Sequence, residues 1–191
     1  MMRIITGTAR GTKLATLEGD MTRPTTERAK EAIFSMIQFD IEGRSVLDLF
    51  AGSGQMGLEA LSRGAEHATL VDQAKAPIGI IIQNAQKTRL ADRCRIVCAD
   101  YAEFLRSRTG SERYDLVFLD PPYGDNLLPG ALRLLMEKRL LKPGALLVCE
   151  SGSETIFGDT ATAAKYTVLR TAKYGVSYVT LLTPAEKEAD A

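Results

Sequence analysis

Residues 46–54 read VLDLFAGSG, and this stretch decides the fold. An apolar run of this kind predicts a buried strand, and the glycines that follow predict a tight turn into a helix. Gly52, Gly54 and Gly57 fit the pattern GxGxxG, in which free N–H groups at a helix N-terminus face a ligand. Asp72 follows Gly52 by twenty residues, where a carboxylate can hold both ribose hydroxyls. The pattern predicts a nucleotide-type cofactor, either a dinucleotide or S-adenosylmethionine.

Short apolar runs alternate with amphipathic stretches downstream of this turn, which is typical of an α/β protein with a mostly parallel, Rossmann-like sheet. Two later β-rich runs predict a hairpin that closes the sheet with an antiparallel edge. We expect strands at 45–49, 68–71, 95–98, 116–119 and 145–150, helices at 55–62, 77–88, 101–107 and 127–138, and hairpin strands at 166–171 and 176–182 joined by residues 172–175.

The segment before residue 41 lacks the alternation of strands and helices that follows it. Residues 3–8 and 12–15 flank a turn, which predicts a small hairpin, and Thr25 or Thr26 is expected to cap a helix that continues to residue 37. We therefore expect residues 1–40 to form an appendage on the substrate side, residues 41–183 the main domain, and residues 184–191 a flexible polar tail.

The composition fits one globular domain. The chain has 191 residues, of which 45% are hydrophobic and 25% charged, and its 24 basic residues balance 24 acidic ones. A net charge of zero argues weakly against a partner bound by bulk charge alone. The longest apolar run, residues 76–82, is interrupted by Pro77 and Gly79, so we expect no membrane span and no signal peptide, and a cytoplasmic protein.

Cysteine and histidine usage argues against metal or disulfide chemistry. Cys94, Cys98 and Cys149 are odd in number and lie in strand-like runs, which predicts reduced, buried thiols. His67 is the only histidine, and it is more simply a surface residue than a member of a catalytic triad. We expect no metal site.

Two further features separate the candidate cofactors. A carboxylate at Asp48, just before the glycine turn, would repel a pyrophosphate but suits the ammonium group of a methionine moiety. Residues 120–123 read DPPY at the end of a predicted strand, the sheet edge where ligands bind. Together these features favour S-adenosylmethionine and argue against a nicotinamide-dependent oxidoreductase.

The DPPY sequence has the parts needed to activate an exocyclic amine of a nucleobase. Asp120 and the carbonyl of Pro121 can accept the two amine hydrogens, and the two prolines stiffen that carbonyl. Tyr123 offers a face on which an unpaired base can stack. The competing interpretation is a turn that only terminates a strand, because Pro121 and Pro122 would end any strand or helix.

The chain resembles a known family over nearly its whole length. The segments VLDLFAGSG, LEALSRGA, DLVFLDPPY, RIITGTARGTKL, RPTTERAKEAIF and KYG are similar to those of the RsmD-type methyltransferases. The resemblance implies a class I S-adenosylmethionine-dependent methyltransferase fold and transfer of a methyl group to guanine N2 in 16S ribosomal RNA.

The resemblance also implies roles for individual residues. The target base would lie at Asp120, Pro121, Pro122 and Tyr123. The cofactor would be held by Asp48, Ala51, Gly52 and Gly54 at its methionine part, by Asp72 at its ribose, and by Asp100 with Tyr101 at its adenine. Asp72 is one methylene shorter than the Glu that the family often has at this position.

Basic residues of the N-terminal segment are candidates for RNA contact. Arg10, Arg23 and Arg28 could hold phosphates, or Arg23 and Arg28 could pair with nearby carboxylates and only dock the segment. We expect 16S ribosomal RNA within an assembled small-subunit particle as the partner, and a monomeric enzyme. Two alternatives stay open: a DNA or RNA adenine-N6 methyltransferase, and a non-catalytic RNA-binding factor of ribosome assembly.

Overall fold

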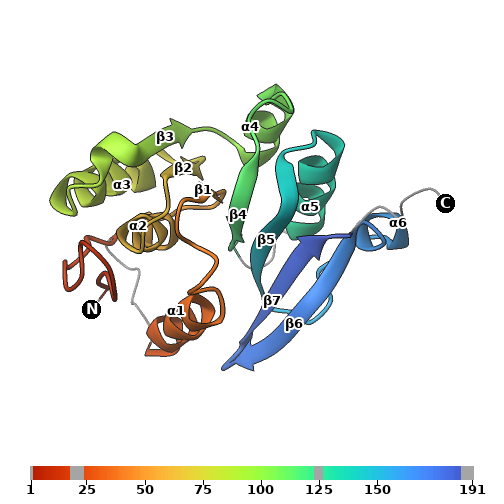
Figure 1. Cartoon of the computed structure of the whole chain (residues 1–191), viewed down its shortest axis with the longest axis horizontal. Helices are drawn as coiled ribbons and strands as arrows, with labels where there is room; N and C mark the ends of the chain where they lie inside the picture. The colour runs from red at the N-terminus through yellow and green to blue at the C-terminus, as the bar shows by residue number, and fades with distance from the viewer. Residues whose placement is uncertain (1, 18–23, 123–126, 186–191) are drawn as a thin grey trace.

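The computed structural model describes residues 2–17, 24–122 and 127–185. Within these ranges seven strands form one sheet in the order β3-β2-β1-β4-β5-β7-β6 (Figure 1). The first five strands of this order are parallel, whereas β7 is antiparallel to both β5 and β6. The strands are β1 (Ser45–Asp48), β2 (His67–Asp72), β3 (Cys94–Cys98), β4 (Tyr114–Leu119), β5 (Leu141–Ser151), β6 (Tyr166–Tyr174) and β7 (Ser177–Pro184). The predicted parallel sheet with an antiparallel edge hairpin is confirmed.

Helices cover both faces of the sheet (Figure 1). One apolar core lies beneath α1 (Pro24–Met36), α2 (Gln55–Ser62) and α3 (Lys75–Lys87), and a second lies beneath α4 (Tyr101–Ser107) and α5 (Leu127–Glu137). Two short helices, η1 (Ala91–Arg93) and α6 (Thr160–Ala163), complete the described elements. Strand residues alternate between the two cores, as the period of a pleated strand requires.

Several predicted boundaries are wrong by a few residues. Helix α1 begins at Pro24, so Thr25 and Thr26 lie in its first turn and do not cap it, because proline is favoured at the first helical position. Helix α3 begins at Lys75, and Pro77 is tolerated because first-turn N–H groups need no partner within the helix. The β6–β7 turn lies at residues 175–176, since Tyr174 already pairs with Ser177.

Two other expectations need correction. The N-terminal hairpin has only one β-bridge among the described residues, between Arg3 and Lys13, because residues 6–11 form turns against α2. Cys98 is exposed and Cys94 is half-buried, since both lie on β3 at the sheet edge, whereas Cys149 on the central strand β5 is buried as expected. None of the described helices is long and apolar enough to cross a bilayer.

A buried carboxylate on α2 holds the N-terminal segment in place. Glu59 is fully buried and accepts hydrogen bonds from the backbone N–H groups of Ile5 (2.7 Å) and Thr6 (3.0 Å). The same carboxylate pairs with Arg63 of its own helix at 2.8 Å and with Lys30 of α1 at 3.1 Å. A single side chain therefore joins α2, α1 and the first residues of the chain.

A buried amide makes a second link. Asn84 on α3 accepts from the N–H of Ala15 at 2.8 Å and donates to the carbonyls of Ala15 (3.0 Å) and Ser53 (2.9 Å). Ser53 belongs to the glycine turn after β1. The N-terminal segment is thus fastened to the turn that the sequence pattern assigns to the cofactor.

Candidate functional site

The glycine turn between β1 and α2 has the conformation that the sequence predicts. Gly52 and Gly54 adopt positive φ values of +52° and +77°, which L side chains rarely adopt. A Cβ atom at Gly54 would approach Ile81 and Leu70 at 3.2 Å, whereas one at Gly52 would have no neighbour within 4 Å. Gly54 therefore permits close packing of the helix, and the open space beside Gly52 lets a ligand approach the backbone.

That open space belongs to a cavity of about 420 Å³ at the carboxyl ends of the parallel strands. Its volume falls in the range of small-molecule sites, roughly 300 to 1,000 Å³. Six of the residues singled out from the sequence line it: Gly52, Asp72, Tyr101, Asp120, Pro121 and Pro122. Leu17 and Gln73 also line the cavity, and no local motif identifies them. Phe50 lines it as well; it belongs to the VLDLFAGSG stretch but was not singled out as a site residue.

Asp72 closes one side of this cavity from the end of β2. Its carboxylate accepts from the N–H of Gly52 at 3.0 Å and from the N–H of Ala74 at 2.9 Å. The side chain is thereby fixed between the glycine turn and the start of α3. A carboxylate held in this way can still accept from ribose hydroxyls, because each oxygen has a second lone pair.

Asp48 lies behind the turn and does not line the cavity. Its carboxylate is 3% exposed and accepts from the N–H of Gly57 at 3.0 Å. Burial, and to a smaller extent the charge of Asp72, raise the pKa of Asp48 to about 7, although the bond from Gly57 lowers it. Ala51 is also buried, with its N–H donated to Val71. The structure shows both residues shaping the turn, and direct contact with a cofactor stays a prediction for them.

Tyr101 begins α4 and lines the opposite side of the cavity, whereas Asp100 precedes the helix and does not line the cavity, so its contact with adenine stays a prediction. Asp100 caps the helix, since its Oδ1 accepts from the N–H groups of Ala102 (2.9 Å) and Glu103 (3.1 Å). The ring of Tyr101 lies 5.4 Å from the ring of Phe50, measured between centroids, and both rings face the cavity. Two aromatic walls suit a flat heterocycle such as adenine.

Asp120 follows β4 and belongs to a row of carboxylates on one face of the sheet. Asp48 is level with Phe118 on the neighbouring strand, and Glu150, the penultimate residue of β5, lies beside Asp120. The side chain of Asp120 reaches solvent through the cavity, yet the surrounding protein desolvates it, and the charges of Glu150 and Asp48 add to this effect. Together they raise its pKa to about 8. No group of three metal-ligating side chains occurs in the described ranges, so this row is not arranged as a metal site.

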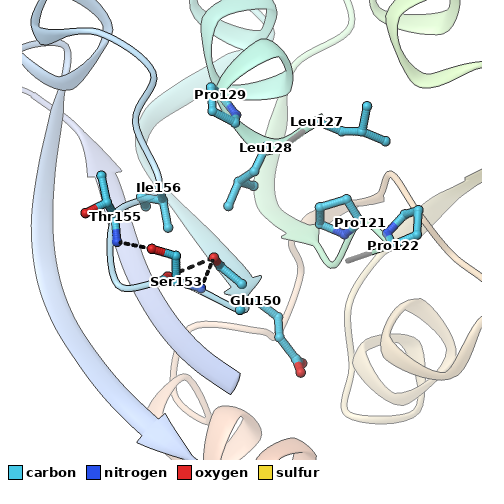
Figure 2. Close-up of a pocket in the computed structure, with 11 residues that line it drawn as sticks. Pro121, Pro122, Leu127, Leu128, Pro129, Glu150, Ser153, Thr155 and Ile156 are labelled. Atoms are coloured by element: carbon cyan, nitrogen blue, oxygen red, sulfur yellow. Dashed lines mark hydrogen bonds between the residues drawn. The ribbon is translucent and has the colours of Figure 1, made fainter. Parts of the chain in front are cut away.

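A second cavity, of about 320 Å³, adjoins the first at Pro121 and Pro122 (Figure 2). Leu128 and Ile156 form apolar walls, and Glu150 lies at its border with its carboxylate directed away from them (Figure 2). Hydrogen bonds between Ser151, Ser153 and Thr155 fix the loop after β5 that forms the far wall. Pro121 and Pro122 therefore lie between two cavities, one on the side of the glycine turn and one on the side of β5, whereas Asp120 lines only the first of these two.

Several predicted contacts lie elsewhere in the molecule or outside the described residues. Arg10 is exposed beside Thr8 and Ala9, which bond to Ser62 at the end of α2, about 12 Å along that helix from the glycine turn. Arg28 is exposed on α1. Arg23 and Tyr123 lie outside the described residues. The structure thus brings Gly52, Asp72, Tyr101 and the first three residues of DPPY to one cavity. It does not bring Asp48, Ala51, Gly54, Asp100 or Arg10 to the lining of that cavity.

Known proteins resemble this chain over most of its length. The family described as conserved hypothetical protein 95 matches residues 2–183. Ribosomal RNA small subunit methyltransferase D of Escherichia coli is 36% identical over 191 residues, which are 100% of this chain and 94% of the relative. The protein of the same name from Haemophilus influenzae is 37% identical over 151 residues, or 78% of each chain.

A solved structure agrees with this relationship. The Escherichia coli protein yhhF superposes with a TM-score of 0.85 at 33% identity, covering 97% of this chain and 99% of that one. The glycine turn, the DPPY strand end and the sheet order thus occur together with full-length similarity. The chain belongs to the RsmD-type methyltransferase family.

Proposed function

We propose that this protein transfers a methyl group from S-adenosylmethionine to the exocyclic N2 of a guanine in small-subunit ribosomal RNA. The observation that carries the proposal is the position of Pro121 and Pro122 between a cofactor-sized cavity, which Asp120 also lines, and a second cavity that can receive a base. The relatives named Ribosomal RNA small subunit methyltransferase D support ribosomal RNA as the substrate class.

The lining residues fit the three parts of the cofactor. The open backbone at Gly52 suits the methionine part, the carboxylate of Asp72 the ribose, and the rings of Phe50 and Tyr101 the adenine. When bound, S-adenosylmethionine supplies an electrophilic methyl carbon on a sulfonium. The protein has to orient the acceptor nitrogen toward that carbon and exclude water, which is mainly a task of positioning.

Asp120 and Pro121 perform the remaining chemistry in this proposal. The guanine amine is a poor nucleophile because its lone pair is delocalised into the ring. Acceptance of its two hydrogens by the Asp120 carboxylate and the Pro121 carbonyl stabilises the positive charge that develops on nitrogen during attack. One N–H bond then breaks, and Asp120 takes the released proton. A pKa near 8 suits a group that must exchange a proton near neutral pH.

Methyl transfer to small ribosomal subunits that lack base methylation tests the function directly. Nucleoside analysis of the product is expected to show N2-methylguanosine with the wild-type protein. An Asp120→Ala variant is expected to lose roughly 10²- to 10³-fold in rate, as removal of one stabilising group at a developing charge does. Cofactor binding by this variant, measured by calorimetry, should persist, which separates loss of chemistry from loss of fold.

Other products would refute the proposal in different ways. N6-methyladenosine would assign the protein to the adenine class, because the DPPY geometry serves any exocyclic amine. Absence of any methyl transfer despite cofactor binding would favour a non-catalytic RNA-binding factor of ribosome assembly. Either result would still be compatible with the fold and the cofactor cavity described above.

We further propose that the substrate is an assembled small-subunit particle in the cytoplasm and that the enzyme is a monomer. The zero net charge supports the particle over naked RNA. A protein without a basic excess gains little from counterion release on naked RNA, so ribosomal proteins are expected to contribute to binding. Activity on protein-free ribosomal RNA equal to that on small subunits would contradict this part of the proposal.

A further inference from the structure

Glu150 was not singled out by any sequence motif, yet it lies next to Asp120 at the strand ends. In the parallel pair β4–β5, Leu119 is level with Cys149, so Asp120 and Glu150 follow at the same level of adjacent strands. Such strands lie roughly 4.8 Å apart. Leu119 and Cys149 both belong to the core beneath α4 and α5, so the two acidic residues that follow alternate to the opposite face.

The positions of the cavities along the sheet edge indicate which part of a bound base Glu150 can contact. The cofactor cavity lies over β1 and β2 and includes Asp120 but not Glu150. Glu150 instead borders the 320 Å³ cavity and, together with Asp120, a small recess beneath α1 and α2. A base whose exocyclic nitrogen faces both the cofactor and Asp120 must therefore extend its ring toward β5. There Pro121 provides apolar surface for the ring, while the carboxylate of Glu150 is directed away from Leu128 and Ile156, toward the face that it shares with Asp120 (Figure 2).

The chemistry of the base edge then distinguishes the two purines. Guanine presents two neighbouring donors, the N2 amine and N1–H, whereas adenine presents its amine beside an N1 that accepts. Two acidic side chains on adjacent strands offer acceptors for two neighbouring donors. A carboxylate opposite adenine N1 would instead place two acceptors against each other, leaving both without a hydrogen bond.

We propose that Glu150 is the residue that selects guanine, by accepting the N1–H of the target base while Asp120 and Pro121 hold its N2 amine. The proposal rests on the proposed function. It adds the group that determines which purine is methylated, which the DPPY motif does not specify. The charge of Glu150 also acts on Asp120, whose pKa it raises, so the experiment has to separate recognition from this electrostatic effect.

A base analogue separates the two effects. 2-Aminopurine keeps the exocyclic 2-amine but has no hydrogen on N1. Small subunits are reconstituted with ribosomal RNA that carries either guanine or 2-aminopurine at the methylated position, which is mapped beforehand with the wild-type protein. The wild-type protein is expected to prefer guanine by about 10- to 100-fold in kcat/KM, the range for a lost hydrogen bond to a charged group.

The Glu150→Gln variant is expected to reduce this preference to near unity, because the amide of glutamine can donate to the bare N1 of 2-aminopurine. Glu154→Gln is the matched control, since Glu154 is an exposed residue of the loop that follows β5 and should keep the wild-type preference. Cofactor binding by all variants should be unchanged, because neither residue lines the cofactor cavity.

The outcomes are distinct. If Glu150→Gln changes both rates by one common factor and preserves the preference, Glu150 acts only through Asp120 and the inference is overturned. The same conclusion follows if the wild-type protein does not distinguish the two bases. If the wild-type protein makes no N2-methylguanosine at all, the proposed function fails, and the inference fails with it.

Discussion

At the scale of single residues, the carboxyl of Asp120 has an unusual environment. Desolvation, together with the neighbouring charges of Glu150 and Asp48, raises its pKa from the ordinary value near 4 to about 8. Only the ionised form can accept both an amine hydrogen and the released proton. We therefore expect the active form of Asp120 to increase as the pH rises toward 8.

The rate of methyl transfer should consequently rise with pH. Below the pKa each unit of pH increases the ionised fraction about tenfold, so we expect kcat to climb from pH 6 and level off above about pH 8. Single-turnover rates over this range measure the midpoint. Glu150→Gln should move the midpoint to lower pH, because it removes a charge that raises the pKa, whereas Glu154→Gln should leave it in place. A flat profile would exclude Asp120 as the proton acceptor.

Residue identity alone reveals part of this site. Asp48, Asp72 and Asp120 are recognisable because each ends a predicted strand at the edge where ligands bind. Glu150 ends a strand as well, but no motif surrounds it, and its importance appears only when β4 and β5 are seen to be neighbours. Strand order is a non-local property that periodicity cannot supply.

At the scale of elements, the N-terminal segment depends on a close backbone contact with α2. A Cβ atom at Gly7, where φ is +86°, would lie 1.8 Å from the backbone oxygen of Ser62. Gly11 has a similar φ of +81° but no atom within 4 Å of such a Cβ. The two glycines therefore share the same backbone requirement and differ in the space around them.

This pair makes a controlled comparison. Gly11→Ala is expected to lower the free energy of unfolding by about 1 to 2 kcal/mol, the cost of a left-handed conformation for an L residue. Gly7→Ala should lower it further, because the segment must also move away from α2. Urea denaturation of both variants measures the difference. Equal losses would show that the contact with Ser62 contributes nothing.

The buried carboxylate of Glu59 gives a second prediction at this scale. The change Glu59→Gln removes the carboxylate that pairs with Lys30 and Arg63, and loss of one member of a buried pair costs about 3 to 5 kcal/mol. Glu137→Gln breaks the helix pair with Arg133, which has the same spacing but is half exposed, and should cost at most about 1 kcal/mol. Similar midpoints of thermal unfolding for both variants would contradict this role of Glu59.

At the scale of the whole molecule, ligand binding provides a test of the cofactor class. A ligand at 100 times its Kd stabilises the folded state by about 2.7 kcal/mol, which for a chain of this size raises Tm by roughly 5 to 11 °C. We expect this rise with S-adenosylmethionine and none with a nicotinamide dinucleotide. Stabilisation by the dinucleotide and not by S-adenosylmethionine would instead indicate an oxidoreductase, a class with which the glycine turn alone is also compatible.

The overall architecture was largely predictable, because alternating strand and helix patterns leave few ways to pack a parallel sheet. The contacts between the N-terminal segment and the sheet were not. In the sequence, nothing distinguishes Glu59 and Asn84 from other polar helix residues. Only the folded chain shows that they form hydrogen bonds with the backbone of residues 5–6 and 15. The first residues therefore share a core with the sheet, including Ile4 and Leu14.

The link from Asn84 to Ala15 and Ser53 carries a consequence for turnover. Two residues beyond Ala15, Leu17 forms part of the wall of the cofactor cavity, although it belongs to the segment assigned to the substrate side. An RNA bound to this segment would therefore lie against a wall of the cofactor cavity. In steady-state kinetics we expect such a shared wall to favour compulsory order, with the small molecule entering first and leaving last.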